Sequence, residues 1–223
     1  MIRLSRRLRH AALPALFALS STASAALPTL ASSTFDSDTE GWTFLNDARY
    51  FAWSPRDGNP DGHIHGTDIA NDQTWYYVAP EAFLGNKLAA LNGTLSYDML
   101  QDRATGQYDA ADVILIGNGV ALVWEFDYNP AETWTHFSVT LNPSAGWRVG
   151  DPLGDHATDD DFHTVLSDLS ALYIRGEYRN LTGFDNSGLD NVVLLAGVVP
   201  EPAPVALLLG GMALIGVAAR RLR

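Results

Sequence analysis

The feature that most constrains the fold is a series of short strand-like segments separated by turn signals roughly every ten residues. Residues 94–100 and 135–141 alternate between apolar and polar side chains, the period of a half-buried β-strand. Only residues 159–169 carry apolar side chains at helical spacing, behind three acidic residues and an N-cap. A parallel α/β sheet would need a helix after most strands. The pattern therefore predicts an all-β antiparallel sandwich with one short helix.

The other segments complete the expected sandwich. Apolar runs at residues 112–116 and 120–126 flank Gly117-Asn118-Gly119, a strong hairpin signal. Residues 55–62 hold two prolines and two glycines, so we expect a loop there. The remaining expected elements are a first strand at 35–38, strands at 50–53, 75–78, 172–174 and 189–195, and one helical turn at 81–85.

The charge of the central region limits its partners. Residues 31–198 carry seven basic and 25 acidic side chains, a net charge of −18, whereas the whole chain has −12 because its ends are rich in arginine. Such a field repels nucleic acid and anionic lipid surfaces, and is compatible with divalent cations. Cysteine is absent, which excludes disulfides. About 170 residues can bury about 70% of their unfolded surface without such cross-links, so we expect one domain.

The N-terminus has the three parts of a secretory signal. Arg3, Arg6, Arg7 and Arg9 form a basic segment, residues 11–19 are apolar, and Ala23-Ser24-Ala25 is a small-x-small cleavage site. We expect residues 1–25 to form a signal helix that is cut after Ala25.

The C-terminus carries a second apolar segment. Val199-Pro200-Glu201-Pro202 precedes an apolar run at 205–219, and Arg220-Arg221-Leu222-Arg223 ends the chain. As a transmembrane helix the run would span only about 22 Å, less than the bilayer core of about 30 Å. Two interpretations stay open: a short anchor that is retained, or a removable sorting signal.

The order of these C-terminal parts closely resembles the PEP-CTERM sorting domain of exported bacterial proteins. The resemblance implies that an exosortase, a membrane transpeptidase, processes residues 199–223. The expected organisation is thus a signal peptide (1–25), a sandwich domain (31–198) and a sorting tail held in the inner membrane before release to the cell surface.

The central region resembles the Laminin B domain, also called laminin IV type A, over roughly residues 35–195. The resemblance rests on Gly58-Asn59-Pro60-Asp61-Gly62-His63-Ile64, Trp75-Tyr76-Tyr77-Val78-Ala79-Pro80, Gly93-Thr94-Leu95-Ser96-Tyr97-Asp98, Trp134-Thr135-His136-Phe137, Leu172-Tyr173-Ile174-Arg175-Gly176-Glu177-Tyr178 and Gly188-Leu189-Asp190-Asn191-Val192. It implies a jelly-roll sandwich akin to carbohydrate-binding modules, with no general catalytic residues.

Two acids are candidates for a structural calcium site. Asp36, on the expected first strand, and Asp190, on the last, would be neighbours if the chain ends pair. Carboxylate and backbone oxygens suit Ca²⁺, and jelly-roll modules often hold calcium there. Asp38 and Asn191 are weaker candidates. The alternative is a pair of solvated acids at a strand edge.

Three further constellations have ordinary alternatives. Asp159-Asp160-Asp161 suits a helix N-terminus better than a metal site. His63 and His65 would share one face of a strand, but a metal site would need a third ligand. Glu125 and Asp127 could act as paired glycosidase carboxylates, although acids two residues apart are common on a solvated face.

Six tryptophans could supply a stacking platform for sugar rings: Trp42, Trp53, Trp75, Trp124, Trp134 and Trp147. Most should be buried in the core. Trp53, beside the expected loop, is the preferred exposed ring.

Together these features favour a non-enzymatic surface or matrix protein that acts in adhesion or polymer interaction. The alternative is a carbohydrate-binding module with an aromatic platform, and a hydrolase is the least favoured reading. Expected partners are an exosortase, the membrane and extracellular polysaccharide, but not nucleic acid.

Overall fold

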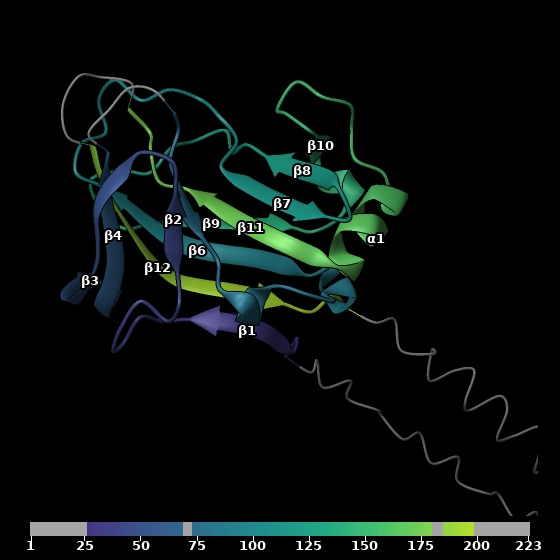
Figure 1. Ribbon diagram of the computed structural model, residues 1–223, viewed down its shortest axis with the longest axis horizontal. Coiled ribbons are helices and arrows are strands. Elements are labelled where there is room, and N and C mark those ends of the chain that lie inside the picture. Colours follow the sequence, from purple (N-terminus) through teal and green to yellow (C-terminus); the bar gives the residue numbers. More distant parts are fainter. Residues whose placement is uncertain (1–25, 69–72, 180–184, 199–223) are drawn as a thin grey trace, which may run out of the picture.

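The computed structural model describes residues 26–68, 73–179 and 185–198, which form two antiparallel sheets packed face to face (Figure 1). Sheet A has the order β3-β4-β12-β6-β9, with β1 also pairing with β12, and sheet B has the order β10-β8-β7-β11-β5-β2. The predicted sandwich is confirmed. The strands are β1 (Thr29–Ser33), β2 (Thr43–Leu45), β3 (Ala48–Gly58), β4 (Asp61–Asp68), β5 (Tyr76–Val78), β6 (Thr94–Gln101), β7 (Val113–Gly117), β8 (Val120–Trp124), β9 (Thr135–Thr140), β10 (Arg148–Val149), β11 (Leu169–Arg175) and β12 (Asp185–Leu195).

The core lies between the two sheets and is rich in aromatic rings. Three of the six tryptophans, Trp42, Trp75 and Trp147, are buried there, and Trp53 and Trp124 pack against the core partly buried. On β6 the alternation is confirmed for the apolar side chains, because Leu95, Tyr97 and Met99 are fully buried. Asp98, expected on the solvated face, is also buried, and that exception marks the candidate site described below.

The β7–β8 hairpin turns where the sequence predicted it. Gly117 pairs with Val120, so the connection is the two residues Asn118 and Gly119. Both have positive φ, +49° and +78°, the combination that a type I′ turn requires.

The helix α1 (Asp159–Ser167) packs against β7 and β8, and it is the one α-helix among the described residues. Thr158 is its N-cap, and the carboxylate of Asp161 accepts a hydrogen bond from the Thr158 backbone N–H at 2.8 Å. The hydrogen bonds from Thr158 also lower the pKa of Asp161. The acidic triplet thus serves the helix N-terminus, as its position indicated. Single 3₁₀ turns occur at Glu81–Phe83, Leu88–Ala90 and Pro143–Ala145.

The predicted first strand at residues 35–38 is wrong. The first strand is β1, which begins at Thr29, before the expected domain boundary. Phe35 has a φ of +52°, which a regular strand does not allow, and its ring packs against Trp42 with centroids 6.1 Å apart. The expected pairing of the chain ends is nevertheless present, because β1 runs antiparallel to β12.

The predicted loop at residues 55–62 is also wrong, since β3 and β4 form a hairpin there. Gly58 pairs with Asp61, and the turn is Asn59-Pro60. The glycines of β4 allow close packing rather than a loop. A Cβ on Gly62 would lie 2.0 Å from the Phe35 carbonyl oxygen, and one on Gly66 would lie 2.7 Å from the Trp75 ring.

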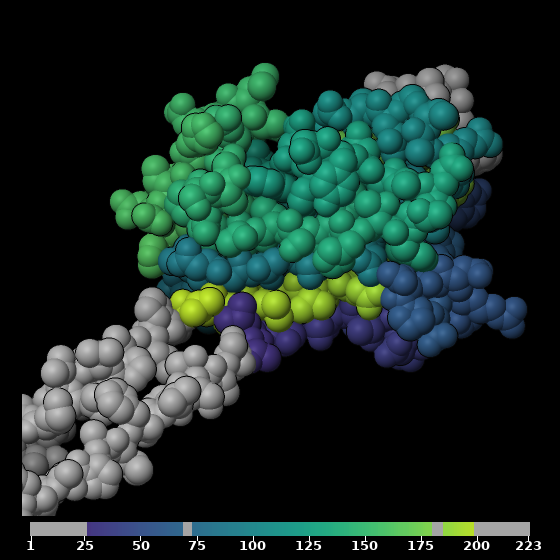
Figure 2. Space-filling model, turned by 180° about the vertical axis from the view of Figure 1, so that it is seen from behind, coloured from purple at the N-terminus to yellow at the C-terminus, as the bar shows by residue number. Residues whose placement is uncertain are grey.

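The predicted signal helix (1–25) and tail (199–223) lie outside the described residues. Of the helices within residues 26–68, 73–179 and 185–198, none combines the length and hydropathy needed to cross a bilayer. Pro28 and Ala196 are joined by a backbone hydrogen bond of 2.8 Å. The two ends of the domain therefore lie together, away from the β3–β4 hairpin (Figure 2).

Thr158→Ala should lower the free energy of unfolding by about 1 kcal/mol, because it removes the N-cap oxygen of α1. Urea denaturation measures this change. Thr133→Ala, at an exposed loop position, is the matched control and should change stability by less than about 0.5 kcal/mol. Equal effects of the two substitutions would contradict the capping account.

Candidate functional site

The candidate site lies on the outer face of sheet A, which we define as the side turned away from sheet B. Successive side chains of a strand point to opposite sides of its sheet. Ile64, Leu189 and Met99 point into the core and are fully buried. Their neighbours therefore share the outer face: His63 and His65 on β4, Gly188 and Asp190 on β12, and Asp98 and Leu100 on β6. In Figure 2 the bands of β12 and β6 run side by side, next to the projecting β3–β4 hairpin in blue.

The tip of the β3–β4 hairpin folds over this face and is held there by hydrogen bonds to two carboxylates. The Asn59 backbone N–H donates to Asp190 Oδ2 at 2.6 Å, and the Asn59 side-chain amide donates to Asp98 Oδ2 at 3.0 Å. The Asn191 amide donates to the Asn59 carbonyl oxygen and to Asp98 Oδ2 at 2.9 Å. This cover explains why Asp98 is buried.

The two carboxylates are cross-strand neighbours, so their charges repel. The pKa of Asp190 is raised to about 6, first by burial and then by the negative charges of Asp98 and Asp36. Backbone N–H groups of Asn59 and Asn191 oppose this shift. Asp98 also lies 2.7 Å from His136 Nδ1. An Nδ1–H of His136 can donate a hydrogen bond to this carboxylate.

Trp134 links the hairpin tip to the sheet. Its indole N–H donates to the Asp57 carbonyl oxygen at 3.0 Å, and its ring meets the His63 ring edge-on, with centroids 5.5 Å apart. A Cβ on Gly188 would lie 3.0 Å from the Trp134 ring and 3.1 Å from His63. Glycine at this position of β12 lets the two rings lie close to the sheet.

A shallow groove of ≈ 210 Å³, here called the sheet A groove, opens beside these rings. It is lined by His63, His65, Leu100, Asp102, Asn186 and Gly188. The Asn186 amide donates to Asp102 Oδ2 at 2.7 Å and its oxygen accepts from Thr67 at 2.6 Å, so these polar groups are held in place.

Burial favours the neutral form of both groove histidines. Burial lowers the pKa of His63 and of His65, and for His63 the charge of His65 adds to the effect. Each neutral ring offers one donor and one acceptor. An aromatic ring, neutral imidazoles and an oriented amide–carboxylate pair are suited to a ligand with apolar faces and hydroxyl edges.

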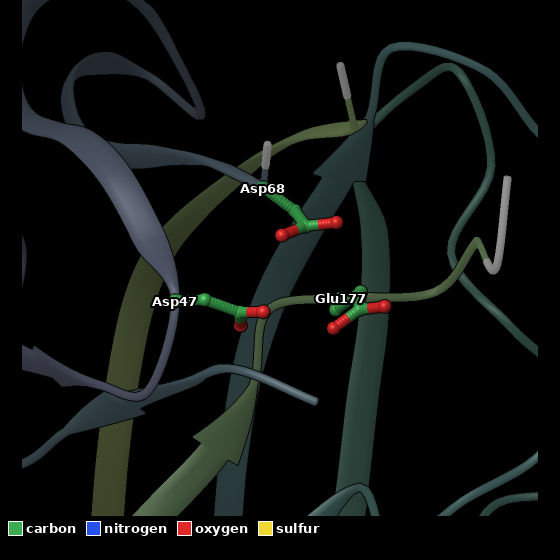
Figure 3. A group of neighbouring side chains, drawn as sticks. All are labelled: Asp47, Asp68 and Glu177. Carbon is green, nitrogen blue, oxygen red and sulfur yellow. The ribbon is translucent and has the colours of Figure 1, made fainter. Parts of the chain in front are cut away.

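A second polar cluster, the acidic triad, lies at another place in the fold (Figure 3). Asp47 in the β2–β3 connection, Asp68 at the end of β4 and Glu177 after β11 bring carboxylate oxygens within 4.8 Å of one another. The pKa of Glu177 is raised to about 7, first by burial and then by the charge of Asp68. Clustered carboxylates of this kind are chemically able to coordinate Ca²⁺.

Of the predicted calcium pair, Asp190 is buried and Asp36 is exposed. Asp36 lies in the turn after β1 and accepts a hydrogen bond from the Thr34 hydroxyl at 2.9 Å. Its negative charge contributes to the raised pKa of Asp190. Both oxygens of Asp190 already accept backbone N–H groups, from Asn59 and Asn191. Asp38 instead accepts from the Glu40 backbone N–H at 2.6 Å. Calcium binding by Asp36 and Asp190 stays a prediction.

Other predicted residues lie as follows. His63 and His65 share one face, with ring centroids 5.7 Å apart, but in the part of the chain that the structure describes they do not join a group of three metal ligands. Glu125 lines a groove with Trp124 and Arg148, and Asp127 is not among its lining residues.

Trp53 is less open than expected. It packs, partly buried, against the core, and its indole N–H donates to the Phe35 carbonyl oxygen at 2.6 Å. Trp134, rather than Trp53, contacts a side chain that lines the sheet A groove, namely His63. The sequence reasoning listed Trp134 without singling it out, and missed Asn59, Asp98 and Gly188. Asn59 lies in the motif Gly58-Asn59-Pro60-Asp61-Gly62, which was interpreted as a loop, whereas Asp98 and Gly188 lie in two other segments that resemble the Laminin B domain.

Comparison with known proteins supplies the family. The profile of the Laminin B (Domain IV) family matches residues 76–207. Laminin subunit gamma-1 of Danio rerio is 30% identical over 175 residues, covering 73% of this chain and 10% of that protein. Human laminin subunit gamma-2 is 29% identical over 185 residues, covering 77% and 14%. The chain thus spans only a small part of the relatives it matches.

Two solved structures share the fold. The L4b domain of human laminin alpha-2 superposes with a TM-score of 0.52 at 17% identity, covering 72% of this chain and 99% of that one. The family 11 carbohydrate-binding module of a Clostridium thermocellum cellulase gives 0.50 at 13% identity, covering 81% and 99%. Since the family profile spans more than half of the sequence, this chain belongs to the Laminin B (Domain IV) family.

Proposed function

We propose that this protein is an exported, non-enzymatic module that binds neutral polysaccharide in the sheet A groove and so acts in adhesion or in an extracellular matrix. The single observation that carries the proposal is the groove itself. The His63 ring lines the groove together with the hydrogen-bonded Asp102–Asn186 pair, and the Trp134 ring packs against His63, where Gly188 leaves room for both rings.

Charge and similarity support this choice of ligand. A net charge of −18 over residues 31–198 disfavours polyanions, which leaves neutral polymers as the favoured class. The family 11 neighbour is named as a carbohydrate-binding module, and a Caenorhabditis elegans relative, 32% identical over 114 residues, is named a basement membrane proteoglycan. A hydrolase is less well supported, because Asp127 is not among the residues that line the groove at Glu125.

Trp134→Ala should weaken polysaccharide binding by about 2 kcal/mol or more, roughly 30-fold. The substitution removes the ring beside the groove, and with it the hydrogen bond that holds the hairpin tip at Asp57. A glycan array identifies the neutral polysaccharide that binds, and affinity electrophoresis with that polymer measures the change.

The matched control is Trp53→Phe, which alters a tryptophan on the core side of β3. It should leave the affinity unchanged once the melting temperature shows that the protein is folded. If Trp53→Phe lost binding and Trp134→Ala kept full binding, Trp53 would be the stacking ring. The sheet A groove would then not be the binding site.

We also propose that the two ends direct export and sorting. The support is the sequence alone: Ala23 and Ala25 for signal cleavage, and Val199-Pro200-Glu201-Pro202 with Arg220 and Arg221 for an exosortase-type enzyme. Replacing Pro200, Glu201 and Pro202 with alanine should keep the protein in the membrane fraction. Cell fractionation with sequencing of the mature C-terminus measures this, and unchanged release would end the sorting proposal.

A structural calcium ion remains part of the proposal, with two possible positions. One is the Asp36–Asp190 pair and the other is the acidic triad, where three carboxylates converge. A ligand that binds only the folded state raises the melting temperature, so EDTA should lower it. Asp36→Asn should abolish the calcium effect if the ion lies at the Asp36–Asp190 pair. Glu177→Gln should abolish it if the ion lies in the acidic triad.

The pH dependence gives an independent check on the triad. The folded-state pKa of Glu177, about 7, exceeds its usual value of 4.5, so the folded protein holds this proton more tightly. That stabilisation is complete below about pH 4.5 and is lost as the pH rises through 7. In EDTA, the melting temperature should therefore fall between pH 5 and 8, and less steeply in Glu177→Gln. Bound calcium would replace the proton and flatten the dependence of the melting temperature on pH. Identical pH profiles with and without calcium would show that the acidic triad does not bind the metal.

A further inference from the structure

Two aromatic rings, Phe44 and Tyr50, are exposed at one corner of the sandwich. The chain passes there from β2 in sheet B to β3 in sheet A through Asn46 and Asp47. Phe44 is 41% exposed and Tyr50 is 73% exposed, whereas Phe51 turns inward toward Tyr77, with ring centroids 6.3 Å apart. We call the surface formed by Phe44, Tyr50 and Phe51 the Tyr50 corner.

The backbone presents Tyr50 at a cost in stability. Its φ is +51°, in the left-handed region that costs an L-residue about 1–2 kcal/mol. The register of β3 against β4 shifts between Arg49 and Ala52, so the strand bulges where Tyr50 projects. Glycine or asparagine would fit this backbone better. A large exposed ring at a strained position is a pattern associated with function rather than folding.

The corner is hollowed as well as aromatic. A hollow of ≈ 450 Å³ is lined by Phe44, Asn46, Asp47, Arg49, Tyr50 and Phe51, within the range of roughly 300–1,000 Å³ found for small-molecule sites. Its lining shares no residue with the sheet A groove. A ligand bound there would occupy a site separate from that groove, and the hollow shares Asp47 with the acidic triad.

We propose that the Tyr50 corner is a second sugar-binding subsite, which takes one pyranose unit of a neutral polysaccharide against the Phe44 and Tyr50 rings. This inference rests on the proposed function and makes the domain bivalent. The polar lining has both signs of charge and an amide, with Asp47, Arg49 and Asn46. These side chains can form hydrogen bonds with the hydroxyl groups of a sugar. An apolar protein surface bound there would leave the same side chains without hydrogen-bond partners.

Two sites in one rigid domain have a measurable consequence. A polymer that reaches both sites is bound with an avidity that can exceed either single affinity by about 10²–10⁴-fold. A short oligosaccharide cannot bridge them and should bind with a stoichiometry of two per chain.

The test uses Tyr50→Asn, which removes the ring and suits the left-handed backbone. The melting temperature should stay the same or rise, while affinity for the polysaccharide chosen from the glycan array falls by about 10-fold or more. By isothermal titration with a short oligosaccharide of that polymer, the stoichiometry should fall from two to one. Tyr50→Phe should retain both properties, and Leu153→Ala, which truncates a side chain that is 95% exposed elsewhere, is the control.

The outcomes separate this inference from the proposed function. Full polymer affinity and unchanged stoichiometry in Tyr50→Asn would overturn the second subsite, while loss of binding in Trp134→Ala would still uphold the groove. If Tyr50→Asn lost all binding while Trp134→Ala retained it, the Tyr50 corner would be the binding site and the proposal for the sheet A groove would be wrong. A wild-type protein that binds no neutral polysaccharide on the array would overturn both, and capture of a protein at an intact Tyr50 would identify the corner as a protein-docking surface instead.

Discussion

Sheet A depends on the bulge in β12. This strand pairs with β4, β6 and β1, and its register against β6 shifts between Asp190 and Val193. Asn191 takes a left-handed φ of +50° at this point, a conformation that asparagine tolerates better than most residues. Before the bulge, Leu189 pairs with Ile64 of β4, and after it Val192 pairs with Ser33 of β1. One strand thus joins the β3–β4 hairpin to β1.

The same bulge prepares the outer face. Asp190 points out of the sheet beside Asp98, and the two buried carboxylates would be strongly unfavourable without donors. The Asn59 and Asn191 groups supply those donors, which fixes the hairpin tip over the sheet. The tip in turn accepts the indole N–H of Trp134. We infer that the sheet A groove is largely preformed, which lowers the entropy lost on binding.

The elements that could be predicted from sequence are those specified by local chemistry. The β7–β8 turn needs only Asn118 and Gly119, and α1 needs only its apolar spacing and Thr158. The wrong predictions involve long-range packing. Gly62 was one of the residues that suggested a loop at 55–62, but it lies in β4 and makes room for the backbone of Phe35, which no local pattern could indicate.

The candidate site was harder to predict for the same reason. Trp134 and Asp57 are 77 residues apart in the sequence, and Asn59 and Asp190 are 131 apart. The acidic triad likewise joins three segments that only the topology brings together. The sequence could identify tryptophans and acids as types of residue, but their exposure depends on where the hairpin tip lies.

The most direct measurement of the central claim is an NMR titration of the protein with a neutral oligosaccharide, following the six tryptophan indole N–H signals. The account predicts that the Trp134 signal shifts most, together with the ring resonances of His63 and His65. Saturable shifts that leave these three residues unchanged would contradict a binding site on the outer face of sheet A.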